Sequence, residues 1–241
     1  MTGWSLYPEA HYGGFTRHDG TLAFYHRVQA LLTPGMTVAN VGCGRGVCAE
    51  DAARYRAALC DLRGGGRTVI GLDPDAQAAG NPFLDHFFQL RDPAWPLASG
   101  SVDLCVADWV LEHVEHPDAF FHECARVLKP GGYFCARTSN AMSLLGFGAR
   151  MIPNRWHAPL LQKLHNSRQP EDIFPTRYFC NTRSALLRLL RQHGFHHPVI
   201  WGHAAEPSYF NAPHFAYLLE WLSLRLMPSA WRNMLLIFAQ R

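Results

Sequence analysis

The sequence predicts an α/β protein, in which helices cover both faces of a doubly wound, mostly parallel β-sheet. Short runs rich in β-branched residues alternate along the chain with segments that carry apolar residues at helical spacing. Glycine and proline close most of these segments, as they do where strands and helices end. Of the 241 residues, 48% are hydrophobic and 17% are charged, which is a globular composition with enough chain for a sizeable core. Strands that alternate with helices form parallel sheets covered on both faces.

Seven runs are expected to form the strands of this sheet. The first is followed at once by a glycine, and the second ends at Asp73-Pro74. The expected strands are residues 37–41, 67–72, 86–90, 102–107, 133–138, 197–201 and 234–239. Because ligands of such sheets bind beyond the carboxyl ends of the strands, the loops after these strands should line one crevice.

Four segments are expected to form helices. Residues 20–32 carry apolar side chains at helical spacing, and residues 47–62 follow the first strand. Pro117 suits the first turn of the third helix, because an amide hydrogen at that position has no acceptor within the helix. Asn181 is expected to cap the fourth helix, which Gly194 closes.

A glycine-rich turn, GCGRG, connects the first strand to the helix after it. Gly42, Gly44 and Gly46 allow a tight turn and let a ligand approach the backbone without a Cβ in the way. Nicotinamide and flavin enzymes use the spacing G-x-G-x-x-G, whose last glycine is replaced here by Val47. The loop therefore allows a ligand to lie close to the backbone, but its spacing argues against a dinucleotide oxidoreductase. Alone, it is also compatible with an ordinary turn between a strand and a helix.

Three motifs together resemble a known family. VGCGRG is followed by VIGLDPD at 69–75 and by SGSVDLCVADWVLEHVEHPDAFFHECARVLKPGGYF at 99–134. This combination is similar to class I S-adenosylmethionine-dependent methyltransferases, and most of all to their type 11 group. The resemblance covers roughly residues 20–140. It implies a Rossmann-like sheet of seven strands with the last one antiparallel, S-adenosyl-L-methionine as cofactor, and methyl transfer as the activity.

The resemblance also implies which residues hold the cofactor. Asp73 matches the acid that binds the ribose, because a carboxylate accepts hydrogen bonds from both hydroxyls, although it also suits a helix cap. Asn40 stands where the family commonly has an acid, and an amide supplies no negative charge to the cofactor's ammonium group. Asp92 is expected near the adenine, with a solvated loop position as the alternative. The full expected set is Asn40, Gly42, Cys43, Gly44, Gly46, Asp73, Pro74, Asp92, Asp108 and Trp109.

Two residues near the end of the fourth strand are expected to serve the chemistry. Asp108 leaves the strand at the crevice, close to where the sulfonium and its methyl group would lie. His113 follows in the string LEH and can orient substrate or take a proton, although packing at the start of the next helix is the slightly favoured alternative. A sulfonium methyl group is already a strong electrophile, so alignment and exclusion of water are the main requirements.

The chain is expected to form one methyltransferase domain over 1–241, with a cap insertion at 139–180 and a second insertion at 202–231. Both connections are long for such a fold, so they are expected to select the acceptor, a small molecule that is glycan-like or lipid-linked. The cap holds Arg150, Trp156, His157, His165 and Arg168. The second insertion has an apolar stripe that suits packing, a dimer face or peripheral membrane contact through 213–227. Its members are Phe215, Leu218, Leu219, Leu222, Leu226 and Met227.

Composition limits the other partners. A net charge of +3 without a basic block gives no reason to expect nucleic acid. The seven cysteines include no C-x-x-C pair, which favours a protein of a reducing compartment such as the cytoplasm. Separately, neither a signal peptide nor a membrane span is expected. The fourteen histidines show no metal-ligand spacing, so no metal is expected, and His196 and His197 should face opposite sides of a strand. The oligomeric state is left open between a monomer and a homodimer. A non-catalytic, methyltransferase-like binding protein is the alternative, because of Asn40.

Overall fold

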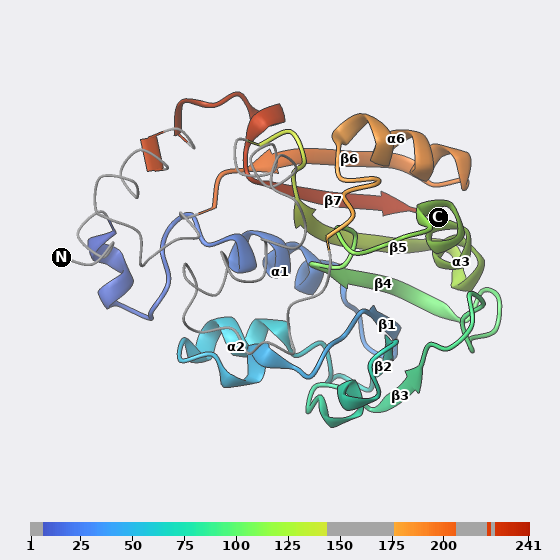
Figure 1. Cartoon of the computed structure of the whole chain (residues 1–241). Coiled ribbons are helices and arrows are strands. Elements are labelled where there is room, and N and C mark those ends of the chain that lie inside the picture. The colour runs from blue at the N-terminus through green and yellow to red at the C-terminus, as the bar shows by residue number, and fades with distance from the viewer. Residues whose placement is uncertain (1–6, 144–175, 206–220, 223–224) are drawn as a thin grey trace.

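The expected sheet is present in a computed structural model, which describes residues 7–143, 176–205, 221–222 and 225–241. Within these residues seven strands form one sheet in the order β3-β2-β1-β4-β5-β7-β6 (Figure 1). The strands are β1 Thr37–Val41, β2 Thr68–Asp73, β3 His86–Gln89, β4 Val102–Asp108, β5 Leu128–Ser139, β6 His196–His203 and β7 Met234–Gln240. β7 runs antiparallel to both of its neighbours, whereas the other paired strands run parallel. The predicted fold class is therefore confirmed.

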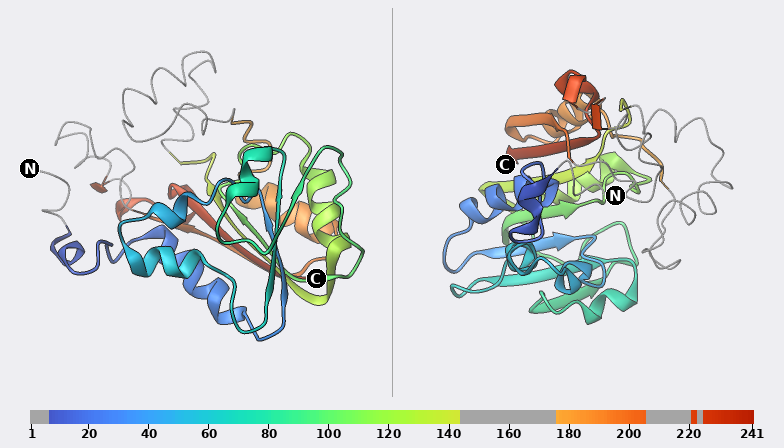
Figure 2. Two further views of the ribbon diagram at one scale, coloured as in Figure 1. Left: turned by 90° about the horizontal axis from the view of Figure 1, so that it is seen from below. Right: turned by 90° about the vertical axis from the view of Figure 1, so that its left-hand side faces the viewer.

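Helices cover both faces of this sheet. α1 Gly20–Leu31 and α2 Arg54–Cys60 lie together on one face, and α3 Pro117–Val127 and α6 Arg183–Gln192 lie on the other (Figure 2). Short 3₁₀ turns complete the connections. They are η2 Pro8–His11, η3 Val47–Glu50, η4 Ala76–Gly80 and η6 Ser229–Trp231.

The central strand β4 shows why its sequence is a continuous apolar run. Leu104 and Val106 pack with Phe24 of α1, while Cys105 and Ala107 pack with Phe121 of α3. All of these side chains are fully buried. Because this part of the strand is covered on both faces, the charged side chains of β4 lie only near its two ends, at Asp103 and Asp108.

Two predicted element boundaries are wrong. The single helix expected over 47–62 is divided into η3 and α2, because the Asp51 side chain accepts a hydrogen bond from the Ala53 N–H at 2.9 Å and so turns the chain between them. β5 begins at Leu128, directly after α3 and earlier than the expected residue 133. Gly131 N–H donates to Arg241 O at 2.7 Å, which extends the pairing of β5 over the predicted stop signal.

Two further corrections concern the second half. Thr182, rather than Asn181, caps α6, since its hydroxyl accepts from the Ala185 N–H at 3.2 Å. Asn181 is buried, and its amide donates to Thr138 Oγ1 at 2.6 Å. His196 and His197 do not alternate, and both are exposed. The register between β6 and β7 shifts there, and His197 has a φ of +46°.

Most of the two expected insertions lies outside the described residues. This holds for 144–175, 206–220 and 223–224, and with them for Arg150, Trp156, His157, His165, Arg168, Phe215, Leu218 and Leu219. Leu222 and Leu226 are exposed. β6 extends to His203, two residues past its expected end at residue 201 and into the expected second insertion. In the part of the chain that the structure describes, no helix is long and apolar enough to cross a membrane.

We predict that Thr182→Ala lowers the free energy of unfolding by about 1 kcal/mol, because the first turn of α6 loses its side-chain cap. Urea denaturation measures this change. Thr182→Ser is the matched control, since serine keeps the hydroxyl and should retain most of the stability. Equal stabilities of the alanine variant and the parent protein would show that the hydroxyl does not cap the helix.

Candidate functional site

The carboxyl ends of β1, β2 and β4 meet at one edge of the sheet, where the glycine loop begins. Val41 at the end of β1 is paired with Leu72 of β2 and with Ala107 of β4. Gly42 N–H donates to Leu72 O at 2.6 Å, so the loop turns over the end of β2. The sheet therefore brings the glycine loop beside Asp73, as the sequence predicts.

The three glycines of the loop differ in what surrounds them. All have positive φ angles, which are 63° at Gly42, 53° at Gly44 and 80° at Gly46. A Cβ on Gly42 would lie 2.5 Å from Val110 Cγ2, and a Cβ on Gly46 would lie 2.6 Å from Asn81 Oδ1. A Cβ on Gly44 would meet no atom within 4 Å. Only Gly44 therefore presents bare backbone to open space, whereas the other two make room for the protein's own side chains.

Asp73 connects the end of β2 to this open position. One carboxylate oxygen accepts from the Gly44 N–H at 2.9 Å, and the other accepts from the Asp75 N–H at 2.8 Å. Burial raises the pKa of the Asp73 carboxyl, although both backbone donors lower it. The helix cap that the sequence left as an alternative belongs to Asp75, which accepts from the Gln77 N–H at 2.9 Å. Each oxygen of Asp73 retains a lone pair for a further donor.

Asn81 holds the glycine loop by binding the loop's backbone carbonyl groups, a role that no sequence pattern indicated. Its side-chain amide donates to Cys43 O at 2.9 Å and to Gly44 O at 3.1 Å. Its Oδ1 accepts from the Phe83 N–H at 3.0 Å. The dipeptide Asn81-Pro82 is a turn signal, but it does not indicate which distant segment the amide would bind.

The remaining expected cofactor residues differ in how exposed they are. Asn40 is half-buried near the end of β1, Pro74 is exposed after β2, and Asp92 is exposed in the loop after β3. Burial and the nearby Asp73 raise the pKa of the Cys43 thiol to about 12, so this side chain is neutral. Their roles toward a cofactor stay predictions.

Asp108 forms an ion pair at the end of β4 instead of facing the crevice alone. Arg137 of β5 donates to both carboxylate oxygens, with Nη2 2.9 Å from Oδ2. Tyr25 of α1 donates its hydroxyl to Oδ2 at 3.0 Å, and Arg137 Nη1 also donates to Thr21 Oγ1 at 2.8 Å. Trp109 has a φ of +57°, and its ring lies 5.4 Å from the Arg137 guanidinium. Asp108 is thus occupied by the protein's own donors, and its catalytic role stays a prediction.

The turn after β4 places His113 and Glu112 differently. His113 is half-buried, with its N–H bound to Val110 O at 2.9 Å, and its role as a base or a packing residue stays a prediction. Glu112 is buried and accepts from Thr138 Oγ1 at 2.7 Å. Burial raises the pKa of the Glu112 carboxyl.

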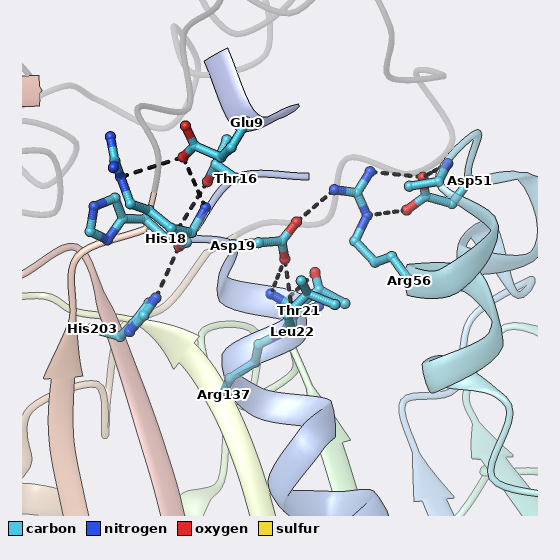
Figure 3. A network of polar contacts seen from close by, with 12 residues as sticks. Glu9, Thr16, His18, Asp19, Thr21, Leu22, Asp51, Arg56, Arg137 and His203 are labelled. Carbon is cyan, nitrogen blue, oxygen red and sulfur yellow. Dashed lines mark hydrogen bonds and ion pairs between the residues drawn. The ribbon is translucent and has the colours of Figure 1, made fainter. Parts of the chain in front are cut away.

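A second ion-pair network holds the amino end of α1 (Figure 3). The guanidinium of Arg56 binds both oxygens of Asp51, with Nη2 2.7 Å from Oδ1, and also reaches Asp19 Oδ2 at 2.6 Å. Asp19 in turn caps α1 by accepting from the Thr21 N–H at 2.8 Å. Arg56 lowers the pKa of the Asp51 carboxyl, as expected for a partly buried pair. The segment after the glycine loop and α1 are therefore fixed to each other.

The turn at Gly13 and Gly14 lies beside this network. Both glycines line a cavity of about 550 Å³ together with residues 52–56. Among the residues that the structure describes, no three histidine, cysteine, aspartate or glutamate side chains are grouped as metal ligands.

We predict that Glu112→Gln changes how stability depends on pH. The pKa of this carboxyl is raised above its ordinary value of 4.5 in the folded state, so ionisation disfavours folding. The unfolding free energy of the parent protein should therefore fall relative to that of the variant as the pH rises above the ordinary glutamate pKa of 4.5. Urea denaturation at a series of pH values measures the difference. Glu115→Gln removes an exposed carboxylate and is the control for the lost charge. If the unfolding free energies of the parent protein and of Glu112→Gln depend on pH in the same way, the prediction is contradicted.

Comparison with known proteins supports the same family. The family model described as "Methyltransferase domain" matches residues 39–136. A ubiquinone biosynthesis O-methyltransferase of Caulobacter vibrioides is 29% identical over 163 residues, which cover 64% of this chain and 63% of the relative. A mitochondrial ubiquinone biosynthesis O-methyltransferase of Mus musculus is 32% identical over 136 residues, which cover 52% of this chain and 34% of the relative. The chain thus spans less than two thirds of these curated relatives.

Solved structures share the fold at lower sequence identity. An S-adenosylmethionine-dependent methyltransferase of Thermotoga maritima has a TM-score of 0.54 and 18% identity, covering 91% of this chain and 88% of that one. A geranyl diphosphate C-methyltransferase of Streptomyces coelicolor A3(2), in complex with S-adenosyl-L-homocysteine, has a TM-score of 0.54 and 18% identity, covering 90% of this chain and 76% of that one. The family match and the shared fold confirm the resemblance that the sequence motifs predict. Over residues 39–136, this chain is similar to the class I S-adenosylmethionine-dependent methyltransferases.

Proposed function

We propose that this protein transfers the methyl group of S-adenosyl-L-methionine to a small-molecule acceptor. The observation that carries the proposal is the pairing of Asp73 with the open backbone of Gly44 at the carboxyl edge of the sheet. The names of the relatives, which are O-methyltransferases of ubiquinone biosynthesis, support an oxygen atom as the acceptor.

The residues at this edge fit the proposed cofactor. Asp73 has acceptor capacity left for the two ribose hydroxyls, and Gly44 allows the adenosyl group to lie against the backbone. When bound, the cofactor supplies an electrophilic methyl group on a positively charged sulfur. The protein's part is to hold the cofactor, align the acceptor with the methyl group and exclude water.

Asp108 acts, in this proposal, as a positioning residue. Both of its oxygens are bound by Arg137, and Tyr25 adds a third hydrogen bond, so removing a proton from the acceptor would cost the ion pair. Protonation of Asp108 would leave the buried guanidinium of Arg137 without its charged partner, which is strongly unfavourable. Asp108 and Arg137 instead fix α1 over the end of β4, and His113 stays the candidate for proton transfer to or from an acceptor.

One observation favours a second candidate function. Asn40 is half-buried near the end of β1 and brings no negative charge to the cofactor's ammonium group. A methyltransferase-like protein that binds a partner without catalysis would tolerate this residue. Isothermal titration with S-adenosyl-L-methionine distinguishes the two functions, because only the enzyme requires cofactor binding.

We also propose that the protein works in a reducing compartment such as the cytoplasm. All seven cysteines are free, and five of them are buried. Burial raises the pKa of the thiols of Cys135 and Cys180, which suits packing residues rather than disulfide partners.

We predict that Asp73→Ala weakens binding of S-adenosyl-L-methionine by about 1–3 kcal/mol, because a charged acceptor of ribose hydrogen bonds is lost. Isothermal titration calorimetry measures the change. Asp103→Ala is the matched control, since Asp103 also binds a backbone N–H, that of Thr37 at 2.8 Å, but lies near the opposite end of β4. Its affinity should equal that of the parent protein. Unchanged affinity of Asp73→Ala would remove the ribose role.

A further inference from the structure

We propose that Asn81 is a positioning residue, which presets the glycine loop for the cofactor by binding two of its carbonyl groups. The inference rests on the proposed function and adds a residue that the family motifs do not contain. It concerns the loop before any ligand arrives, because the hydrogen bonds of Asn81 are made within the protein itself.

The hydrogen bonds of Asn81 determine the orientation of its amide. The side chain follows η4 and is 6% exposed. Two carbonyl oxygens, Cys43 O and Gly44 O, lie against Nδ2. A carbonyl oxygen can only accept a hydrogen bond, so the atom that faces them must be the amide nitrogen. The Phe83 N–H faces Oδ1 and requires an acceptor. Only an amide in this orientation satisfies all three groups.

The packing at Gly46 shows how closely the loop follows Asn81. A Cβ on Gly46 would lie 2.6 Å from Asn81 Oδ1 and 2.8 Å from Pro82 Cδ. The backbone from Cys43 to Gly46 therefore passes around the Asn81 side chain. The carbonyl groups of Cys43 and Gly44 accept its hydrogen bonds, and Gly46 lies in close contact with it. A glycine is required at 46 because Asn81 occupies the space of a side chain.

Asn81 and Asp73 bind complementary groups of the same peptide segment. Asp73 accepts from the N–H of Gly44, while Asn81 donates to the C=O of Gly44. A segment with several glycines has many accessible conformations, so ordering it on ligand binding costs conformational entropy. A loop that is already ordered in the free protein avoids this loss and binds more tightly. Loss of the Asn81 donors would leave two loop carbonyls unpaired and release Gly44 from its position beside Asp73.

The test is Asn81→Asp in the full chain. Aspartate has nearly the same shape and still accepts from the Phe83 N–H, but it places an oxygen against the two loop carbonyls. The expected result is at least a tenfold loss of affinity for S-adenosyl-L-homocysteine by isothermal titration calorimetry. A thermal unfolding curve of each variant identifies a temperature at which all of the proteins are folded. The affinities are then measured at that temperature.

Asn140→Asp is the matched control, because Asn140 has the same arrangement on different segments. Its amide donates to Ala230 O at 2.9 Å and to Arg232 O at 2.8 Å, and its Oδ1 accepts from the Met142 N–H at 3.0 Å. Asn140→Asp should lose stability but retain the parent affinity. If both variants lose affinity equally, or if Asn81→Asp retains it, Asn81 has a general structural role and the inference is overturned. If the parent protein itself does not bind the ligand, the proposed function fails first.

Discussion

The hydrogen bond from the Gly44 N–H to the Asp73 carboxylate is the contact on which the candidate site depends. It joins the loop after β1 to the end of β2 and is possible because the glycines of this loop adopt positive φ angles. Asn81 holds the same loop through its carbonyl groups, and Val110 fills the space beside Gly42. Segments that follow β2 and β4 therefore restrain the loop from several directions, and the backbone at Gly44 alone is left open.

Helix α1 is restrained by a second set of contacts. Arg56 ties its capping residue Asp19 to the segment after the glycine loop, and Asp108 with Arg137 ties its first two turns to β4 and β5. A buried ion pair contributes little net stability, because the loss of hydration offsets the attraction between the charges. Its value in this protein is geometric, since two separate networks fix one helix over the carboxyl edge of the sheet.

The sequence was sufficient for the parts of this structure that depend on local pattern. The seven strands follow from β-branched runs with glycine or proline at their ends, and the glycine spacing located the loop beside Asp73. Patterns failed where a distant partner decides the outcome: Arg137 binds Asp108 from a position 29 residues away, and Asn81 binds Cys43 from 38 residues away. Thr182 and Asn181 are both good helix caps by type, and only the burial of Asn181 against Thr138 separates them. The three loop glycines likewise look equivalent until their neighbours are known.

The central claim is that an adenosyl group lies against the backbone of Gly44 with its ribose on Asp73. A crystal structure of the complex with S-adenosyl-L-homocysteine tests it most directly. We expect both ribose hydroxyls within hydrogen-bond distance of the Asp73 carboxylate, and no side chain between the ligand and Gly44. A ligand bound elsewhere on the sheet edge, with Asp73 contacting only the backbone of Gly44 and Asp75, would contradict this account.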